Sequence, residues 1–466
     1  MAAATTILEE CEINPPAGSS PPEFVVPIVF FDMVWYDFAA NQSVLFFDLT
    51  AACSTKPYFL ETLVPDLKSS LSLTLGEFLP LAGKIVHPLT PGGDKPILRY
   101  QSGDSVSFNV CESGADFSEL AGNHPRNCDD FYAFVPNLPP AKRSEKSICC
   151  AVLALQVTLF PGHGFCIGFV THHAAADAST VVSFIQTWAL INKTNDLRDL
   201  LTRSNCLPCF DRKNTTNING LDSLYWDLIL KLSCSVEPPP VKFPIDKLRS
   251  TFVLKKEQIE KLKGLLVAAN CPRVSTFTAA CALVWVCSAK SAGDDVADDE
   301  PEFFGFVADC RGRLKPPVPA NYFGNCVVLV LAELKHGQAK GPNGFVMAAK
   351  AIGDAIVENV YNENGILFGA EKWPEKYDEL IGKRQYGVAG SPRFDFYAVD
   401  YGWGKPKKFE ALFVDGNGSI SLNKARDCEG GLEIGLSKPK LQMDGSLSPS
   451  RYDIRSLVLM DSMPGT

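Results

Sequence analysis

Short apolar runs, which are typical of β-strands, dominate the first part of the chain. They cover residues 24–31, 43–49, 97–100 and 106–110. Between the second and third runs, apolar residues recur every three or four positions over residues 58–79, which predicts a helix with one buried face. The first part is therefore expected to be rich in strands, with at least one amphipathic helix.

The clearest local unit is a hairpin that ends in two histidines. Residues 149–160 form a dense apolar run, residues 161–164 contain the turn formers proline and glycine, and residues 165–171 form a second run. His172 and His173 follow the second run. Asp177 is a natural N-cap for the apolar-periodic segment that follows, so a helix is expected to begin there.

The second part of the chain mixes strand and helix patterns without a strict βαβ alternation. Residues 192–220 are polar and aperiodic, which predicts a linker over the surface. Helices are expected near residues 259–266 and over residues 275–289, and residues 445–466 are expected to be partly disordered. A length of 466 residues exceeds what one compact core serves, so two domains are expected.

Composition and charge exclude several classes of protein. With 46% hydrophobic residues the chain can bury large cores, and its net charge of −9 disfavours non-specific binding to nucleic acid or anionic membrane. A local basic patch would still suffice for an anionic ligand. No apolar run reaches the roughly 18 residues that a membrane span needs.

The cysteines and the N-terminus favour a cytoplasmic protein. The first residues carry no basic and apolar secretory signal. The 16 cysteines are irregularly spaced, often within apolar runs, which favours reduced, buried thiols. Cys206 and Cys209 form a single CxxC without a second pair, so no metal site is expected.

Three segments are candidates for chemistry. His173 and Asp177 have a spacing that arises by chance in about a third of such chains, so their place between a strand and a helix carries more weight. A histidine suits proton abstraction, although a core histidine bonded to the backbone is an alternative. The other two segments are Asp400-Tyr-Gly-Trp-Gly404 and Asn321-Tyr-Phe-Gly-Asn-Cys326, which could equally be a tight turn and a loop before a strand. No GxSxG elbow, phosphate-binding glycine loop or HExxH motif occurs.

Together, in this order and at these separations, the three segments resemble the motifs of the plant BAHD acyltransferases, over residues 5–444. Residues 71–75, 80–83, 156–160 and 389–392, and the sequence Tyr-Phe-Gly-Asn-Cys, resemble the branch that acts on anthocyanins and other phenolic glycosides. The resemblance implies an α/β fold of two similar-sized chloramphenicol-acetyltransferase-like domains, with mixed sheets, helices and an active-site channel at the domain interface. The N-terminal domain would span residues 1–200, with residues 398–424 crossing back to it; residues 201–220 would be the linker and 221–466 the C-terminal domain.

The resemblance also implies a function. The chain would transfer an acyl group from acyl-CoA, its co-substrate, to a sugar hydroxyl of a phenolic glycoside, without a bound cofactor or metal and as a monomer. His173 would be the general base facing the channel, and Asp177 would hold the loop in an ion pair. Asp400, with Gly402, Trp403 and Gly404, would be structural and pair with Arg311 or Arg313. Coenzyme contacts are implied at Ser275, Thr276, Ala389, Gly390, Ser391 and Pro392.

Departures from the family pattern bear on the donor. The chain has Ala178 where glycine is usual, Tyr401 where phenylalanine is usual, and Ser179 where some relatives carry a basic residue. A malonyl carboxylate would then need another cation, such as Arg393, because an unpaired buried charge is unfavourable. Malonyl is favoured as the donor group, hydroxycinnamoyl is the alternative, and a non-catalytic relative that binds a phenolic ligand is the second alternative.

Overall fold

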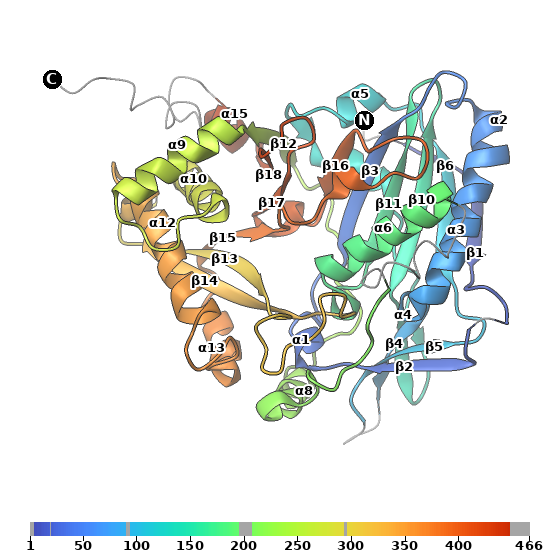
Figure 1. Cartoon of the computed structure of the whole chain (residues 1–466), viewed down its shortest axis with the longest axis horizontal. Coiled ribbons are helices and arrows are strands. Elements are labelled where there is room, and N and C mark those ends of the chain that lie inside the picture. Colours follow the sequence, from blue (N-terminus) through green and yellow to red (C-terminus); the bar gives the residue numbers. More distant parts are fainter. Residues whose placement is uncertain (1–3, 19, 90–93, 195–206, 293–295, 448–466) are drawn as a thin grey trace.

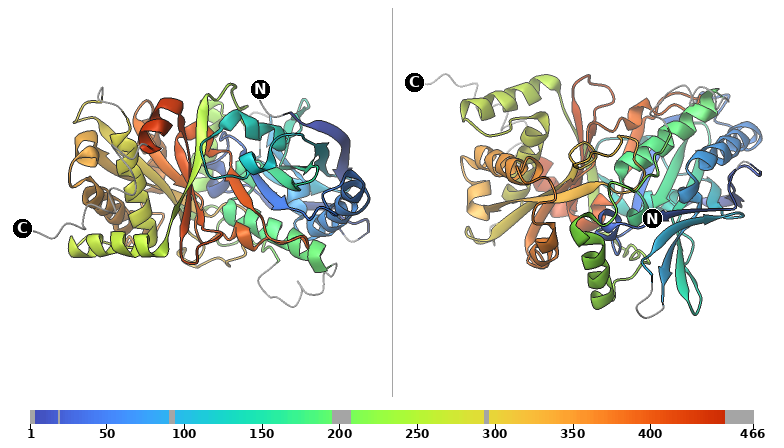
Figure 2. Two further views of the ribbon diagram at one scale, coloured as in Figure 1. Left: turned by 90° about the horizontal axis from the view of Figure 1, so that it is seen from above. Right: turned by 60° about the horizontal axis from the view of Figure 1, so that its bottom comes forward.

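The chain folds into three mixed or antiparallel β-sheets covered by helices (Figures 1 and 2). A computed structural model describes residues 4–18, 20–89, 94–194, 207–292 and 296–447. The two larger sheets lie in opposite halves of the molecule, and the strands of residues 408–439, which belong to both sheets, lie near its middle (Figure 2).

The first large sheet has six strands and carries the predicted hairpin. Its strands, in spatial order, are β1 (Thr6–Ile13), β6 (Val106–Glu112), β10 (Leu153–Phe160), β11 (Gly164–Thr171), β3 (Asn41–Asp48) and β16 (Lys408–Ala411). Every residue of β10 and β11 is buried, so both faces of the sheet are covered. Alternate residues belong to two separate cores: Leu45 and Phe47 lie on one face, Val44 and Phe46 on the other.

Helices α3 (Val64–Glu77) and α6 (Ala178–Thr194) cover the first of these faces. The predicted apolar stripe of α6 is buried, and the indole nitrogen of Trp188 donates to the Leu67 carbonyl 3.1 Å away. The opposite face is covered by α5 (Phe117–Leu120) and the 3₁₀ segment Cys128–Phe134, whose phenylalanines pack around Phe46.

Three predicted elements differ in the structure. The apolar run over residues 149–160 is two strands, because β9 (Ser147–Ala151) joins the five-stranded sheet instead of continuing as β10. The run over residues 24–31 ends as a strand at Pro27, and α1 (Phe30–Met33) follows because Asp32 accepts a hydrogen bond from the Val29 amide at 3.2 Å. The helix over residues 58–79 begins as α2 (Lys56–Tyr58), passes through a π-turn at Phe59–Leu63, and ends before α4 (Leu79–Ala82).

The five-stranded sheet lies beside the first one. Its order is β2 (Glu23–Pro27), β5 (Ile97–Gln101), β4 (Lys84–Pro88), β9 and β8 (Lys142–Arg143), and all of its neighbours are antiparallel. Helix α8 (Leu221–Leu232) packs against α1.

The second large sheet is mixed and has seven strands. Its order is β14 (Val327–Lys335), β13 (Pro301–Asp309), β15 (Arg384–Ala389), β17 (Ser419–Lys424), β18 (Leu432–Pro439), β12 (Lys247–Leu254) and β7 (Arg126–Asn127). Strands β13, β15 and β17 are parallel neighbours. The helices of this part are α9 (Lys256–Ala268), α10 (Thr276–Lys290), α11 (His336–Lys340), α12 (Gly344–Ala355), α13 (Trp373–Asp378), α14 (Val414–Asn417) and α15 (Lys440–Leu447). The family's mixed α/β fold class is confirmed by these sheets and by the structural comparison below.

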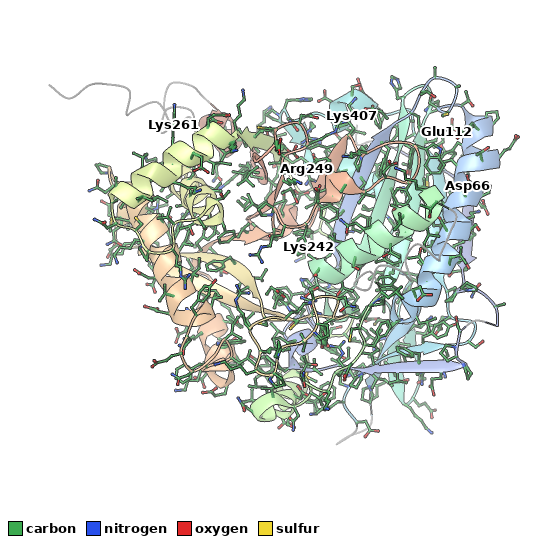
Figure 3. The ribbon with its side chains drawn as sticks, viewed as in Figure 1. Asp66, Glu112, Lys242, Arg249, Lys261 and Lys407 are labelled. Atoms are coloured by element: carbon green, nitrogen blue, oxygen red, sulfur yellow. The ribbon has the colours of Figure 1, made fainter. Side chains whose placement is uncertain are left out.

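Two segments cross between the large sheets, and buried charges hold them in place. Strand β16 lies between β15 and β17 in sequence but pairs with β3, whereas β7 leaves the first half and pairs with β12. Glu410 on β16 binds Arg126 at 2.7 Å and Arg249 at 3.1 Å, and all three side chains are buried (Figure 3 labels Arg249). Burial alone would raise the pKa of Glu410, but the charges of Arg126 and Arg249 hold it below its usual value.

Glu410→Gln should therefore destabilise the fold. The substitution leaves the guanidiniums of Arg126 and Arg249 buried with less counter-charge, and breaking a buried ion pair typically lowers the free energy of unfolding by about 3–5 kcal/mol. The measurement is the denaturant midpoint at neutral pH, with Glu260→Gln as the control, since Glu260 pairs with Lys263 on an exposed helix face. The control should change stability by less than about 1 kcal/mol. Equal midpoints for the two variants would contradict the structural role of Glu410.

The pH dependence has a defined sign. Because the folded-state pKa of Glu410 lies below its unfolded value, its contribution is present above the unfolded pKa and is lost as the pH falls through the folded one. The gap in stability between wild type and Glu410→Gln should shrink on acidification.

Candidate active site

The β10–β11 hairpin ends at a pair of histidines with different surroundings. His172 is fully buried: its Nε2 donates to the Val236 carbonyl at 2.7 Å, and its Nδ1 accepts from the Ala174 amide at 3.2 Å. Both ring nitrogens are therefore occupied, so His172 holds the backbone of neighbouring segments. His173 begins a short 3₁₀ turn, His173–Ala175, and keeps partial exposure.

The imidazole of His173 lies flat on the indole of Trp35. The ring centroids are 4.2 Å apart and the planes differ by 4°, while Phe38 makes a T-shaped contact with the imidazole at 6.2 Å. Burial lowers the pKa of His173 to about 4, so the ring is neutral near pH 7 and can accept a proton. Its Nδ1 is buried without a hydrogen-bond partner among the described residues, which leaves Nε2 as the nitrogen for a substrate proton.

Both carboxylate oxygens of Asp177 accept hydrogen bonds from fixed donors. Its Oδ1 accepts from the Thr180 amide at 3.1 Å and from Arg311 Nη2 at 3.0 Å; its Oδ2 accepts from Arg311 Nη1 at 2.9 Å and from the Cys326 amide at 3.2 Å. The ion pair expected for Asp177 is formed, and Arg311 is its partner. Four donors fill the lone pairs of the carboxylate, so Asp177 ties the loop to the start of α6, to Arg311 and to Cys326.

The segment of residues 321–326 holds the backbone of the histidine. Asn325 donates from Nδ2 to the His173 carbonyl at 2.9 Å, and its amide and side chain both donate to Asp32 Oδ1, at 3.0 and 3.1 Å. Gly324 has φ +107°, and a Cβ there would come within 2.5 Å of the Arg212 side chain. Arg212 pairs in turn with Asp32 at 3.2 Å, and both are buried.

These partners were not predicted from the sequence. Asn325 lies in a recognised motif, but nothing in its spacing shows that it bonds to His173 from 152 residues away. Asp32 and Arg212 lie in no motif, and no signal in a single sequence pairs two residues so far apart.

The segment of residues 400–404 forms a tight turn built on Asp400. Its Oδ1 accepts from the amides of Gly402 at 2.8 Å and Gly404 at 3.1 Å, and Oδ2 pairs with Lys193 at 2.6 Å. Burial would raise the pKa of Asp400, but these hydrogen bonds hold it below its usual value. Both glycines have φ above +100°, a region that disfavours any side chain.

The expected partner of Asp400 was wrong. Arg311 belongs to Asp177, and Arg313 donates to the Asp309 carbonyl at 2.6 Å. Lys193, in the last turn of α6, is the residue that reaches Asp400 instead. Trp403 presents its face to Phe165 at 5.9 Å, at the opposite end of β11 from His173. Since a strand rises about 3.3 Å per residue, this turn lies roughly 20 Å from the histidine.

Tyr401 fills the space between the helix and the sheet. Its ring packs on Trp188 at 5.0 Å and on Phe47 at 5.7 Å. The hydroxyl that distinguishes it from the usual phenylalanine is buried and has no hydrogen-bond partner among the described residues.

The residues implied as coenzyme contacts lie on the second large sheet and its helices. Ser275 is the N-cap of α10 and accepts from the Thr278 amide at 3.0 Å, and Thr276 is the first residue of that helix. Strand β15 ends at Ala389, and Gly390, Ser391 and Pro392 form the turn after it, with Gly390 at φ +97°. All six residues are partly exposed.

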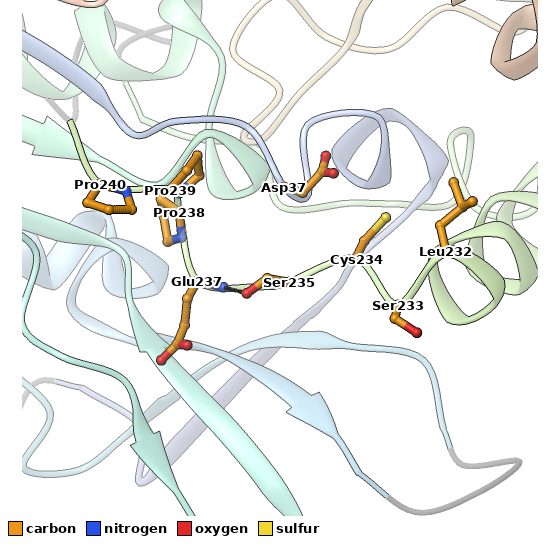
Figure 4. A pocket seen from close by; sticks show the side chains of 9 residues that line it. All are labelled: Asp37, Leu232, Ser233, Cys234, Ser235, Glu237, Pro238, Pro239 and Pro240. Carbon is orange, nitrogen blue, oxygen red and sulfur yellow. Dashed lines mark hydrogen bonds between the residues drawn. The ribbon is translucent and has the colours of Figure 1, made fainter. Parts of the chain in front are cut away.

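A cavity of about 700 Å³ is lined by Asp37 and by residues of the segment 232–240 (Figure 4). Asp37 forms one side, two residues beyond the Trp35 that stacks on His173. The other side is the segment of residues 232–240, which includes the Val236 that holds His172. One side of the cavity therefore follows the residue stacked on His173 in sequence, and the other side belongs to the segment that holds His172. A smaller cavity of about 120 Å³ is lined by Ser179, Thr180 and Tyr322, among others.

The chain belongs to the Transferase family, whose model matches residues 24–446. This match confirms the resemblance to the BAHD acyltransferases that the three motifs predicted. The chain is 41% identical over 448 residues to malonyl-coenzyme:anthocyanin 5-O-glucoside-6'''-O-malonyltransferase of Salvia splendens, with 95% of this chain and 94% of that protein covered.

Other relatives share the same breadth of match. Phenolic glucoside malonyltransferase 1 of Nicotiana tabacum is 41% identical, with 90% of this chain and 91% of that protein covered. Coumaroyl-CoA:anthocyanidin 3-O-glucoside-6''-O-coumaroyltransferase 1 of Arabidopsis thaliana is 32% identical, with 94% and 95% covered. Among solved structures, vinorine synthase superposes with a TM-score of 0.69 at 19% identity, covering 98% of both chains, which shows the same fold.

Two further observations concern the described part of the chain. None of its helices combines the length and the apolar character needed to cross a membrane. Its fifteen described cysteines are free thiols; Cys206, one half of the CxxC, lies outside the described residues.

Asp177→Ala and Asp177→Asn should separate holding the loop from chemistry. The alanine leaves Arg311 buried without its partner and should lower the free energy of unfolding by about 3–5 kcal/mol, with activity falling because His173 is no longer held. Asparagine keeps an oxygen for the Thr180 amide and should retain more stability and more activity. Asp309→Ala is the matched control, because Asp309 also contacts Arg311 at 2.9 Å but is half exposed. Full stability of Asp177→Ala with a thousandfold loss of turnover would instead place Asp177 in the reaction.

Proposed function

We propose that this protein transfers an acyl group from a coenzyme A thioester to a sugar hydroxyl of a phenolic glycoside, with His173 as general base. The observation that carries the proposal is a neutral imidazole, stacked on Trp35 and held at the end of the β10–β11 hairpin in the loop that Asp177 and Arg311 fix. Relatives that are 41% identical over nearly the whole chain are named as malonyltransferases of anthocyanin and phenolic glucosides, which supports the substrate classes.

The proposed reaction is a direct transfer. His173 Nε2 takes the proton of the acceptor hydroxyl as its oxygen attacks the thioester carbonyl carbon, and a tetrahedral oxyanion forms. The oxyanion collapses, the carbon–sulfur bond breaks, and the imidazolium gives its proton to the departing thiolate. The products are the ester and free coenzyme A, and the histidine is again neutral. No acyl-enzyme is required.

The cavity lined by Asp37 and the segment of residues 232–240 is the proposed site of the acceptor. Asp37 and Glu237 supply carboxylates that can accept hydrogen bonds from sugar hydroxyls, and Phe38, which follows Asp37 and has 46% of its surface exposed, offers an aromatic ring near the histidine. The three consecutive prolines, Pro238–Pro240, give the opposite side a backbone with restricted freedom.

Malonyl remains the favoured donor group, with hydroxycinnamoyl as the alternative. The malonyltransferase relatives are 41% identical, and the coumaroyltransferase relative is 32% identical. Ser179 lines the small cavity and brings no charge. Arg393 was suggested from the sequence as the counter-charge of malonyl. Its charge instead contributes to lowering the pKa of the Tyr361 hydroxyl, and no described contact joins it to His173.

The remaining expectations belong to the same proposal. Residues 1–200 with 398–424 and residues 221–466 would be the two domains, joined by residues 201–220; the pairing of β16 with β3 supports the crossing segment. We further propose a cytoplasmic monomer that binds acyl-CoA only as a co-substrate, without a resident cofactor or metal and without affinity for nucleic acid.

His173→Ala should lower kcat by about 10²–10⁴-fold, the range for losing a general base, while melting temperature and donor binding stay close to wild type. The assay follows free thiol and acylated glucoside together. Near-normal turnover would refute the mechanism. If wild type forms neither free thiol nor ester with any donor and acceptor pair, the non-catalytic alternative is favoured.

The pH profile of kcat/KM tests the state of the histidine. An imidazolium cannot accept the proton, so the rate should fall as the pH drops through the folded-state pKa of His173, about 4, and not near the ordinary value of about 6.5. Trp35→Ala, which admits water to the ring, should move this acid limb toward about 6.5. Samples are returned to neutral pH and assayed again as a control for acid unfolding. This control is needed because the buried neutral histidines favour unfolding below about pH 6.5. A wild-type limb near 6.5 would contradict the buried, neutral ring.

Competition between malonyl-CoA and coumaroyl-CoA at equal concentration tests the donor, with flavonoid glucosides as acceptors. We expect more malonylated than coumaroylated product. A tenfold or greater preference for coumaroyl-CoA in kcat/KM, which corresponds to about 1.4 kcal/mol, would reverse the assignment.

A further inference from the structure

The indole N–H of Trp35 is a buried hydrogen-bond donor that the fold leaves unused. Trp35 is buried, and its Nε1 has no hydrogen-bond partner among the residues that the structure describes. A buried indole N–H usually finds a partner, because an unpaired buried donor is unfavourable. The indole nitrogens of Trp188, Trp285 and Trp403 follow this rule, and each donates to an oxygen 3.1 Å away. Trp35 departs from their pattern, so its donor is available to a group that the chain itself does not supply.

The unused donor is fixed against the imidazole of His173. The two rings are parallel within 4°, and their centroids are 4.2 Å apart. An indole N–H bond and an imidazole lone pair both lie in the plane of their own ring. The donor of Trp35 and the Nε2 lone pair of His173 therefore lie in parallel planes no more than 4.2 Å apart. With a hydrogen bond of about 2.8–3.0 Å to each nitrogen, two oxygens on one tetrahedral carbon can reach both planes.

Other donors around the histidine loop already serve the fold. The Nδ2 of Asn325 donates to the carbonyl of the histidine at 2.9 Å. Arg311 and Arg212 keep nitrogens without a partner. Their charges, however, are paired with Asp177 at 2.9 Å and with Asp32 at 3.2 Å. Of these groups, the indole stacked on the imidazole is the neutral donor that is left for a charge that develops during the reaction.

Phe38 connects the two stacked rings to the surface of the protein. It makes T-shaped contacts with Trp35 at 5.0 Å and with His173 at 6.2 Å, and almost half of its surface is exposed. An exposed side chain changes rotamer rapidly, so a substrate that moves the Phe38 ring aside meets the imidazole and the indole together. Phe38 brings no polar atom that competes for the indole N–H, and a hydrogen bond to a charged oxygen is stronger where water is excluded.

We propose that Trp35 is a catalytic residue whose Nε1–H donates a hydrogen bond to the oxyanion of the tetrahedral intermediate. The inference rests on the proposed function and names a donor for its intermediate. When the acceptor oxygen attacks, the π electron pair of the thioester carbonyl moves onto its oxygen, beside the indole N–H. When the carbon–sulfur bond breaks, that pair re-forms the carbonyl and the hydrogen bond weakens. The indole keeps its proton throughout, because it is a donor only.

Trp35→Phe is the direct test, because phenylalanine keeps an aromatic ring against the imidazole and removes the N–H. Its kcat should fall by about 10²–10³-fold, as expected for the loss of one oxyanion donor, with KM and melting temperature close to wild type. The acid limb of kcat/KM should stay where wild type has it, whereas a role limited to shielding the ring of His173 would move it.

Trp188→Phe is the matched control. It also removes a buried indole N–H, but that donor serves the Leu67 carbonyl, so turnover per folded molecule should equal that of wild type. A kcat of Trp35→Phe within about threefold of this control would overturn the proposal. A raised KM for the acceptor with unchanged kcat would do the same, because it would place the hydrogen bond in the ground state.

A tryptophan analogue with sulfur in place of the indole nitrogen separates loss of the donor from a change of shape. Incorporated at position 35, it keeps both fused rings on the imidazole and cannot donate a hydrogen bond. The same loss of kcat as in Trp35→Phe supports the proposal. Full turnover with the analogue, together with a loss in Trp35→Phe, would show that the shape of the ring matters and that the N–H does not.

Hydrolysis of the donor separates this proposal from the proposed function. Water in place of the sugar hydroxyl gives the same kind of oxyanion, so Trp35→Phe should slow malonyl-CoA hydrolysis and glucoside acylation by similar factors. If wild type hydrolyses malonyl-CoA in a manner that depends on Trp35 but acylates no glucoside, the oxyanion donor stands and the proposed acceptor class fails. If wild type acylates glucosides and Trp35→Phe slows neither reaction, the proposed function stands and the role of Trp35 fails. If wild type carries out neither reaction, both are wrong.

Discussion

The buried ion pair between Asp177 and Arg311 is the interaction on which the site depends. It joins three parts of the chain: the turn after the β10–β11 hairpin, the start of α6 through Thr180, and the loop after β13 through Cys326. A buried carboxylate is stable only when its charge and lone pairs are satisfied, and here two guanidinium nitrogens and two amides satisfy them. The position of the neighbouring His173 is fixed by the same bonds.

A second buried pair completes the support from the opposite side. Asp32 binds Arg212 and both donor groups of Asn325, and Asn325 in turn holds the His173 carbonyl. Asp32 lies on α1, three residues before the Trp35 that stacks on the imidazole. The backbone of the histidine and the face of its ring are therefore set by one short segment. Burial keeps the ring neutral, and among the described residues no partner is bonded to its Nδ1.

Local patterns in the sequence were sufficient for the hairpin, for the buried face of α6 and for the histidine at their junction. Each depends on residues close together in the chain, where periodicity and capping carry the information. The order of three motifs was sufficient for the family. The run over residues 149–160 was predicted as one unit, whereas the structure divides it between two sheets. A continuous apolar stretch does not show where a strand ends and the next one joins other neighbours.

Long-range partners could not be predicted from the sequence. Asp400 was expected to bind an arginine, but Lys193, 207 residues away, is brought to it by the last turn of α6. Asn325, Asp32 and Arg212 had no signal for the same reason. Arg273 and Arg313 likewise reach the ring of Tyr361 from separate segments, with guanidinium carbons 3.7 and 5.6 Å from its centre. Ion pairs between distant residues depend on the tertiary structure, and a single sequence does not show which residues it will bring together.

The pairing of β16 with β3 has a consequence for how the chain is made. Phe46 is synthesised 362 residues before its partner Lys408. Over that interval, the edge of β3 that β16 will cover has free amide and carbonyl groups, a state that invites pairing with other chains. The first sheet can be completed only after Ala411 has been synthesised. The nascent chain is thus expected to need protection of this edge, for example by chaperones, until β16 is available.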